Sequence, residues 1–266
     1  MKSCYPNLYQ RRIIIGITGG IAAYKSAELV RLLKQSGADV RVVMTEAATQ
    51  FITPMTFQAL SEHKVRINLF DEEAERAMGH IELARWADFI LIAPATADFI
   101  AKLAQGGADN LLTTLCLATK AQVAIAPAMN QQMWHQAVTQ ENLSVLEKRG
   151  ILQWGPASGA QACGDFGLGR MLEVEELCQH LNDTFKTGIL AGKTVLITAG
   201  PTQEPLDPVR YITKHSSGKL GYALARAAYD AGAKVILITG PVALKAPSAV
   251  ELIDVVTGQE MYEAVL

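Results

Sequence analysis

The chain has 266 residues, of which 50% are hydrophobic and 19% are charged, and its formal net charge at pH 7 is −2. This balance excludes a disordered chain and an extended basic surface for nucleic acid. No apolar run approaches the roughly 18 residues that a membrane helix needs. The sequence therefore predicts one large or two smaller globular domains, with neither a nucleic-acid nor a membrane partner.

The number and spacing of the cysteines further limit the possible classes of function. They form neither a CxxC pair nor a zinc-ligand spacing, and they are too sparse for a disulfide scaffold. The four are Cys4, Cys116, Cys163 and Cys178. We expect reduced thiols in the cytoplasm and no metal site.

The N-terminal segment, residues 1–12, precedes the first apolar run. That run, Ile13–Ile17, is too short for the core of a signal peptide. We expect the first dozen residues to be a frayed lead-in.

The first element is a buried parallel strand over Ile13–Ile17, because the run is continuous, apolar and rich in β-branched residues. A helix over Ile21–Gln35 follows, with Gly37 as its stop. Further strands are predicted over Val40–Met44, Phe89–Ala93 and Val123–Ala126, with helix-like stretches between them. Alternating strands and helices indicate a doubly wound α/β sheet, flavodoxin-like or Rossmann-like.

The pattern then changes over Gly155–Arg170, a glycine-rich segment that predicts a long loop, mobile or functional. A helix is expected over Val174–Asn182, followed by a hinge around Thr187 and Gly188. We place the domain boundary there, with domains at 1–190 and 191–266.

The second domain repeats the opening pattern. Strand-plus-glycine segments occur at Thr194–Pro201 and Lys234–Pro241, and a last strand over Val250–Val256 leads to a helix-like Gln259–Leu266. About three strands are marginal for an independent domain, so the second Rossmann-like unit is expected to be incomplete.

The turn after the first strand, Thr18–Ala23, brings small residues to a helix N-terminus, which suits a phosphate. It is not G-x-G-x-x-G, and Thr45 and Glu46, rather than a ribose-binding acid, follow the second strand. A tight turn without a ligand explains the spacing equally well.

Two further motifs, Ala93–Asp98 and Ala126–Asn130, follow the third and fourth strands at the carboxyl edge, where open α/β sheets bind ligands. The Asn130 amide can both donate and accept, which suits a carboxylate or amide ligand. The alternative is a helix N-cap before Gln131.

Single reactive residues carry less weight. His80 starts an amphipathic stretch and could act as a base or substrate anchor, although a surface or capping histidine is the simpler interpretation. Cys163 lies in the glycine-rich segment and could be exposed and reactive, whereas Cys116 lies in an apolar stretch and should be inert core. In the second domain, His215–Gly221 precedes a helix and could bind phosphate, but Leu220 excludes a Walker loop.

Taken together, these segments closely resemble a known family, the bacterial bifunctional coenzyme A biosynthesis proteins. Those proteins join a phosphopantothenoylcysteine decarboxylase to a phosphopantothenate–cysteine ligase. The resemblance runs from Ile13 onward, and the segments that carry it are Gly19–Lys25, Gly79–Leu83, Ala93–Asp98, Pro127–Asn130, Ala162–Asp165, Gly169–Met171, Ala199–Thr202 and Arg210–Gly221.

The resemblance implies FMN-dependent decarboxylation of 4′-phosphopantothenoylcysteine to 4′-phosphopantetheine. Chemistry supports the need for a flavin, because CO₂ loss from a plain cysteine carboxylate would leave an unstabilised carbanion. Oxidation of the thiol carbon to a thioaldehyde places the carboxylate β to a C=S group that accepts the electrons. The enethiolate then takes back a hydride and a proton, so no external oxidant is consumed.

The resemblance also implies residue roles. His80 would serve the oxidative half as base or positioning group, Asn130 would hold the substrate carboxylate, and Cys163 on a flexible clamp would deliver the final proton. The FMN cradle would be Gly19, Gly20, Ile21, Thr45, Ala95 and Thr96. The substrate contacts would be Met129, Asn130, Ala162, Gly164 and Arg170. Such flavoproteins form homotrimers with sites at subunit contacts, and the bifunctional proteins assemble into larger shells.

The second domain departs from the family pattern. Lys214 stands where the motif has asparagine, and an ammonium has no acceptor. The chain also ends before the later ligase portion, so ligase activity, with its CTP and Mg²⁺, is expected to be absent. The ligase remnant comprises Arg210, His215, Ser216, Ser217, Gly218 and Lys219. The alternative overall function is a flavin-binding regulatory subunit without turnover, against which the joint presence of His80, Asn130 and Cys163 argues.

Overall fold

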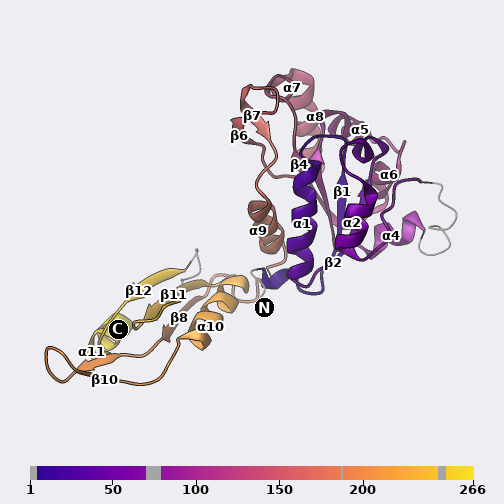
Figure 1. Ribbon diagram of the computed structural model, residues 1–266. Helices are drawn as coiled ribbons and strands as arrows, with labels where there is room; N and C mark the ends of the chain where they lie inside the picture. Colours follow the sequence, from indigo (N-terminus) through magenta and orange to yellow (C-terminus); the bar gives the residue numbers. More distant parts are fainter. Residues whose placement is uncertain (1–4, 70–78, 187, 245–249) are drawn as a thin grey trace. The chain divides into compact units, whose positions relative to one another are not determined.

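The computed structural model describes residues 5–69, 79–186, 188–244 and 250–266. The chain divides into two compact units, Met1–Asn182 and Asp183–Leu266. Each unit is described by itself (Figure 1).

The first unit is built on a five-stranded parallel sheet in the order β2-β1-β3-β4-β5. The strands are β1 (Arg12–Ile17), β2 (Asp39–Met44), β3 (Phe89–Ala95), β4 (Gln122–Pro127) and β5 (Leu152–Gln153). In register, Ile15 lies between Val42 of β2 and Leu91 of β3, and all three side chains are buried. The strand order reverses between β1 and β3, and this switch point is where doubly wound sheets bind ligands.

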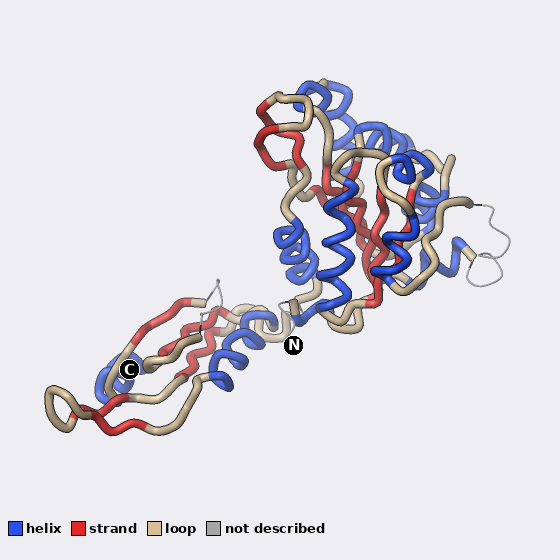
Figure 2. The backbone as a smooth tube through the Cα atoms, viewed as in Figure 1, coloured by secondary structure: helices blue, strands red, loops and turns tan. Residues whose placement is uncertain are grey.

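Helices cover both faces of this sheet (Figures 1 and 2). The helices of this unit are α1 (Ala23–Gln35), α2 (Pro54–Ser61), α4 (His80–Trp86), α5 (Ala97–Gln105), α6 (Leu111–Ala118), α7 (Gln131–His135), α8 (Ala137–Lys148) and α9 (Val174–Thr184). On one face, Phe99, Leu115 and Leu143 from α5, α6 and α8 share a core with Ile92 and Ile125 of the sheet. The predicted doubly wound α/β class is confirmed.

The N-terminal segment corrects one expectation, because residues 5–12 are not frayed. A short 3₁₀ helix, Pro6–Leu8, buries Leu8 completely. The Asn7 backbone N–H donates to Asn182 Oδ1 at 3.0 Å, and the Asn7 side chain donates back to the Asn182 carbonyl. The burial of Leu8 and the contact with Asn182, 175 residues away in sequence, hold this segment in place. No local sequence pattern indicates either of them.

The glycine-rich segment corrects a second expectation, because it folds as a hairpin rather than an irregular loop. Strands β6 (Ala157–Ala160) and β7 (Phe166–Arg170) pair antiparallel, and Cys163 lies in the turn between them. Gly169 has φ +142°, and a Cβ there would collide with the Met129 carbonyl. The glycine thus permits the hairpin to pack against the segment that leads into α7.

The second unit contains a three-stranded parallel sheet, β12-β11-β8, and an antiparallel pair, β10-β9. Its elements are β8 (Thr194–Ala199), β9 (Gln203–Pro205), β10 (Tyr211–Thr213), α10 (Lys219–Asp230), β11 (Lys234–Thr239), β12 (Glu251–Asp254) and α11 (Gly258–Val265). Helix α10 buries Tyr222, Ala225 and Ala228 in a small core with Val235 and Leu237 of β11. The predicted α/β class of the second unit is therefore confirmed. The expected hinge includes Thr187, which lies outside the described residues.

An ion pair at the start of β1 gives a first prediction. Asp88 receives the Arg12 guanidinium at 2.7 and 3.3 Å and the Arg12 backbone N–H at 2.9 Å. Burial by itself raises the pKa of Asp88, but these contacts outweigh it and lower the pKa overall. A carboxyl group whose pKa is lower in the folded protein than in the unfolded chain stabilises the fold at pH values above its unfolded pKa of about 3.9. This contribution is lost as the pH falls through the pKa of the folded state.

Asp88→Asn should therefore lower the free energy of unfolding by about 1 kcal/mol at neutral pH. The difference from wild type should shrink as the pH falls below about 4. Urea unfolding at neutral pH and at acidic pH measures the free energy of unfolding of wild type and variant. Glu28→Gln, at an exposed i,i+3 pair with Arg31, is the control and should change little. An equal loss for Asp88→Asn at both pH values would contradict the electrostatic origin.

Candidate functional site

A cavity of about 1450 Å³ opens at the carboxyl ends of the strands in the first unit. Small-molecule sites usually measure roughly 300–1000 Å³, so two ligands could share this one. The lining comes from the turn after β1, the segments after β2 and β3, the segment after β4 and the β6–β7 hairpin. Its lining residues include Thr18–Ala22, Thr45–Ala47, Thr96–Phe99, Ala128–Asn130, Ala160–Cys163 and Gly169–Met171.

The glycine turn after β1 forms one end of this cavity. The Gly20 N–H donates to the Thr18 carbonyl, and the Ala23 N–H donates to the Gly20 carbonyl as α1 begins, both at 3.0 Å. A Cβ on Gly19 would lie 2.5 Å from the Ala47 Cβ, so no residue with a side chain fits at this position. The N-terminal end of a long helix thus borders the cavity, an arrangement that favours an anion.

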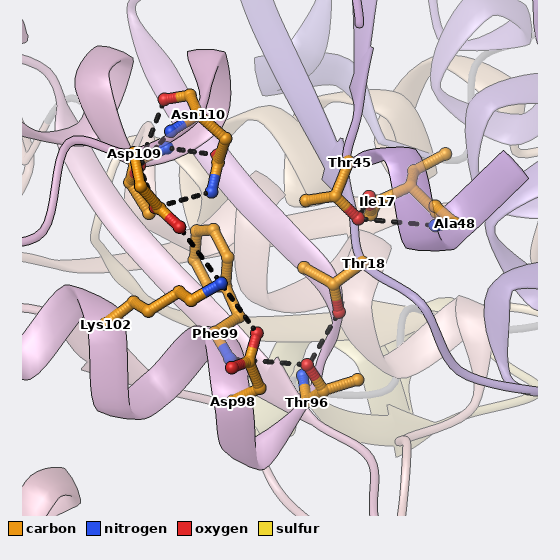
Figure 3. A network of polar contacts seen from close by, with 11 residues as sticks. Ile17, Thr18, Thr45, Ala48, Thr96, Asp98, Phe99, Lys102, Asp109 and Asn110 are labelled. Carbon is orange, nitrogen blue, oxygen red and sulfur yellow. Dashed lines mark hydrogen bonds and ion pairs between the residues drawn. The ribbon is translucent and has the colours of Figure 1, made fainter.

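Three threonines fix the loops around this turn (Figure 3). The buried Thr18 hydroxyl donates to the Pro94 carbonyl at 2.7 Å and accepts from the Thr96 N–H at 3.1 Å. Thr96 caps α5, and Thr45 caps the 3₁₀ helix Glu46–Gln50 by accepting from the Ala48 N–H at 3.3 Å. Thr18 therefore joins the loops that follow β1 and β3.

Thr18→Val should lower the free energy of unfolding by roughly 1–3 kcal/mol, because it leaves the Pro94 carbonyl and the Thr96 N–H without their hydroxyl partner. Urea unfolding of wild type and variant measures the loss. Thr49→Val is the matched control, since the Thr49 hydroxyl is exposed and donates only locally to Glu46. Equal stability of wild type and Thr18→Val would contradict the tie between the two loops.

A charged cluster lines another part of the wall (Figure 3). The Lys102 ammonium contacts Asp109 Oδ2 at 3.0 Å and Asp98 Oδ2 at 3.2 Å. The hydrogen bonds that Lys102 donates to Asp109 and then to Asp98 raise the pKa of Lys102, and the same lysine lowers the pKa of Asp109. Sequence reasoning missed this cluster, although the i,i+4 spacing of Asp98 and Lys102 was a usable signal.

Asn130, Cys163 and Asp165 meet beside the cavity. Asn130 Nδ2 lies 2.9 Å from Asp165 Oδ2 and 3.2 Å from Cys163 Sγ, and Cys163 Sγ lies 3.5 Å from the same carboxylate oxygen. Asn130 Oδ1 meanwhile accepts from the Gln132 N–H at 2.7 Å. The N-cap interpretation of Asn130 is therefore confirmed. The ligand-binding interpretation stays a prediction, and it would use the Nδ2 end of the same carboxamide.

The described cysteines differ sharply in accessibility. Cys116 is half-buried against the core, and burial raises its pKa to about 12. Burial, with Glu175 and Glu28 nearby, likewise raises the pKa of Cys178 to about 12. Cys163 is the exposed thiol of the three cysteines that the structure describes. Its turn therefore carries the accessible sulfur.

Basic side chains also border the cavity. Lys25, with 11% of its side chain exposed, pairs with Glu173 at 2.8 Å, and Arg170 contacts the same carboxylate at 3.4 Å. Hydrogen bonding from Lys25 lowers the pKa of Glu173. Glu173 thus joins helix α1, which follows the glycine turn, to the end of the hairpin.

Most of the predicted site residues line this one cavity. They are Gly19, Gly20, Ile21, Thr45, Thr96, Met129, Asn130, Ala162, Cys163 and Arg170. Ala95 does not, because it is fully buried in the core and its carbonyl accepts from the Ala128 N–H. Gly164 also lies outside the lining, in the hairpin turn with φ +90°. Among the described residues of a single chain, half-buried His80 at the start of α4 is not part of the lining either.

The predicted ligase remnant lies in the second unit. Arg210 contacts Asp207 at 2.6 Å, and Gly218 precedes α10 with φ +71°. Hydrogen bonds from the Val209 backbone N–H and from Arg210 lower the pKa of Asp207. The remaining remnant residues, His215, Ser216, Ser217 and Lys219, are exposed, as is Lys214.

The described residues contain neither a membrane-spanning helix nor a metal-ligand cluster. None of their helices has the length and hydropathy to cross a membrane. Residues 5–69, 79–186, 188–244 and 250–266 also contain no cluster of three or more His, Cys, Asp or Glu that could hold a metal ion.

Comparison with known proteins gives relatives over nearly the whole chain. The Vibrio cholerae coenzyme A biosynthesis bifunctional protein CoaBC is 61% identical over 260 residues, covering 98% of this chain and 65% of the relative. The Escherichia coli K12 protein of the same name is 55% identical, covering 97% and 64%. The chain therefore spans somewhat less than two thirds of the length of these curated relatives.

Solved structures match the first unit. A cysteine-to-serine mutant of PPC decarboxylase, complexed with pantothenoylaminoethenethiol, is similar with a TM-score of 0.57 and 31% identity, covering 65% of this chain and 96% of that one. The FMN binding protein AtHal3 is similar with a TM-score of 0.56 and 31% identity, covering 65% and 95%.

Family models account for both units. The model described as DNA/pantothenate metabolism flavoprotein C-terminal domain matches residues 190–266. The model described as Flavoprotein matches residues 2–186, well over half of the chain. The chain therefore belongs to the flavoprotein family.

Proposed function

We propose that the chain is an FMN-dependent decarboxylase that converts 4′-phosphopantothenoylcysteine to 4′-phosphopantetheine in coenzyme A biosynthesis. The observation that carries the proposal is a single cavity, bordered by the glycine turn at Gly19 and Gly20 and by the Asn130 and Cys163 side chains. Relatives named for coenzyme A biosynthesis and for PPC decarboxylase support the substrate class. We assign this activity to residues 1–190.

The residues around the glycine turn fit FMN. The helix N-terminus at the glycine turn suits its phosphate, and the cavity volume leaves space for a substrate beside the flavin. Once bound, FMN would exchange two electrons reversibly with the thiol-bearing carbon of the substrate. The proposed cradle is Gly19, Gly20, Ile21, Thr45 and Thr96.

The chain's own groups would then orient the substrate and move its proton. The Asn130 carboxamide presents N–H toward the hairpin, where it could hold the carboxylate that leaves as CO₂. Cys163 would donate its proton to the carbon that has lost CO₂. In the PPC decarboxylase relative, the protein complexed with pantothenoylaminoethenethiol is a cysteine-to-serine mutant, which supports this role for the exposed thiol.

The remaining roles extend beyond one subunit. We propose a homotrimer or larger homo-oligomer, in which His80 of one copy faces the cavity of another. Such a contact between subunits would explain why His80, a predicted site residue, does not line the cavity of a single chain. The described thiols fit the proposed cytoplasmic location.

For the second unit, CTP and Mg²⁺ would serve a phosphopantothenate–cysteine ligase in a longer protein. Within this chain, exposed Lys214 offers an ammonium where the family motif has an amide that accepts as well as donates. We therefore propose decarboxylation alone for this chain.

Titration of the purified protein with FMN, followed by addition of 4′-phosphopantothenoylcysteine, tests the proposal. We expect a bound-flavin spectrum and release of CO₂ in proportion to substrate, without an added oxidant. Flavin binding without CO₂ release would instead favour a regulatory subunit. Failure to bind FMN would overturn both functions.

A further inference from the structure

We propose that Asp165 is a positioning residue that sets the orientation of both Asn130 and Cys163. The inference rests on the proposed function, to which it adds a residue that acts through its neighbours. One carboxylate oxygen, Asp165 Oδ2, lies within reach of both groups, at 2.9 Å from Asn130 Nδ2 and 3.5 Å from Cys163 Sγ. The third side of this triangle is the 3.2 Å contact between Asn130 Nδ2 and Cys163 Sγ.

The backbone holds Asp165 firmly enough for this task. Its carbonyl accepts from the Gln161 N–H at 2.8 Å, and the Gly164 N–H closes the turn on the Gln161 carbonyl at 3.0 Å. Gly164 adopts φ +90°, a conformation that side-chain-bearing residues rarely take. The Asp165 side chain therefore projects from a closed turn rather than from a loose loop.

A second set of contacts joins this turn to the segment that carries Asn130. Gln161 Oε1 accepts from the Gln131 N–H at 3.0 Å, and Gln161 Nε2 approaches the Met129 carbonyl at 3.5 Å. The Met129 N–H donates to the Gly169 carbonyl at 2.9 Å. The hairpin and the start of α7 are thus held together on either side of Asn130, and Asp165 completes the contact at the carboxamide itself.

Charge explains why a carboxylate suits this position. Hydrogen bonds from Asn130 and then Cys163 lower the pKa of Asp165, so it stays ionised at neutral pH and can only accept. An acceptor-only partner forces the Nδ2 end of Asn130 toward the sulfur, while Oδ1 accepts from Gln132. Nδ2 carries two hydrogens, so the substrate carboxylate would take the one that lies toward the sulfur while Asp165 keeps the other. The thiol hydrogen of Cys163 is likewise directed by the same oxygen.

Asp165→Ala removes the acceptor, Asp165→Asn keeps an acceptor but removes the charge, and Glu141→Ala removes an exposed carboxylate of α8 as the matched control. With Asp165→Ala we expect a KM raised about tenfold, equivalent to about 1.4 kcal/mol. We also expect a large share of unsaturated enethiol product, because both the carboxylate anchor and the proton donor lose their orientation. Asp165→Asn should recover much of the KM, and Glu141→Ala should match wild type.

A merely structural role for Asp165 would reduce flavin binding or all kinetic constants without changing the ratio of saturated to unsaturated product. That result, or wild-type KM and product ratio in Asp165→Ala, would overturn the inference. Alkylation of Cys163 by iodoacetamide, located by mass spectrometry, separates this inference from the proposed function because it needs no turnover. Faster alkylation in Asp165→Ala than in wild type and Glu141→Ala supports the inference, and an equal rate contradicts it. Absence of CO₂ release from wild type contradicts the proposed function instead.

Discussion

Replacing Cys163 by serine should yield a protein that still releases CO₂ but no longer completes the reaction. The serine hydroxyl is a much weaker acid than the thiol, so the carbon that has lost CO₂ would not receive its proton. General acid catalysis contributes roughly 10²- to 10⁴-fold, so formation of the saturated product should fall by at least about 100-fold. Mass spectrometry of the product distinguishes the saturated thiol from the enethiol.

The control for this substitution lies in the same hairpin. Ser158 is exposed on β6, and Ser158→Ala should keep both the wild-type rate and the saturated product. If Cys163→Ser also made only the saturated thiol at the wild-type rate, Cys163 would have no part in proton delivery.

Replacing His80 by asparagine should abolish flavin reduction by the substrate. The imidazole is the group proposed for the oxidative half, and its loss as a base or anchor should slow flavin bleaching by about 100-fold or more. Anaerobic mixing of the FMN-loaded variant with substrate, followed by flavin absorbance, measures this step alone. Bleaching at the wild-type rate would remove His80 from the mechanism.

A mixing experiment tests whether His80 acts across a subunit contact. Neither His80→Asn nor Cys163→Ser should make the saturated product by itself. When the two are unfolded and refolded together in equal amounts, up to about a quarter of the wild-type yield of saturated product should return, because random assembly pairs an intact histidine with an intact thiol in that fraction of shared sites. If both residues came from one subunit, no mixture would regain activity.

The sheet of the first unit could be predicted because its signals are local. Ile13–Ile17 is a continuous apolar run followed by a glycine turn, and the structure has β1 and then α1 there. A parallel strand buried on both faces needs just such a run. The strand limits shifted by one or two residues, which does not move the cavity.

The β6–β7 hairpin could not be predicted in this way. Its glycines indicate turns, but its position depends on Gln161, whose amide contacts Gln131 and Met129 some 30 residues earlier in the chain. The burial of Leu8 and the contact between Asn7 and Asn182 depend on similarly distant partners. Local sequence patterns do not indicate contacts between residues so far apart in the chain.

The candidate site, too, could be predicted only where its signals are local. Asn130 and Cys163 were identified through motifs, and the structure brings them within 3.2 Å. Asp165 belongs to the same quoted motif as Cys163, yet its contact with Asn130 appears only once the hairpin folds over α7. The resemblance implies that Ala95 belongs to the cradle, but the structure buries Ala95 completely in the core.

The most direct test of the central claim is an anaerobic turnover of the FMN-loaded protein with 4′-phosphopantothenoylcysteine, with flavin absorbance and product mass recorded on the same sample. We expect a saturated product lighter than the substrate by one CO₂, together with flavin that ends the reaction oxidised. Unchanged substrate, or flavin left reduced beside an unsaturated product, would contradict it.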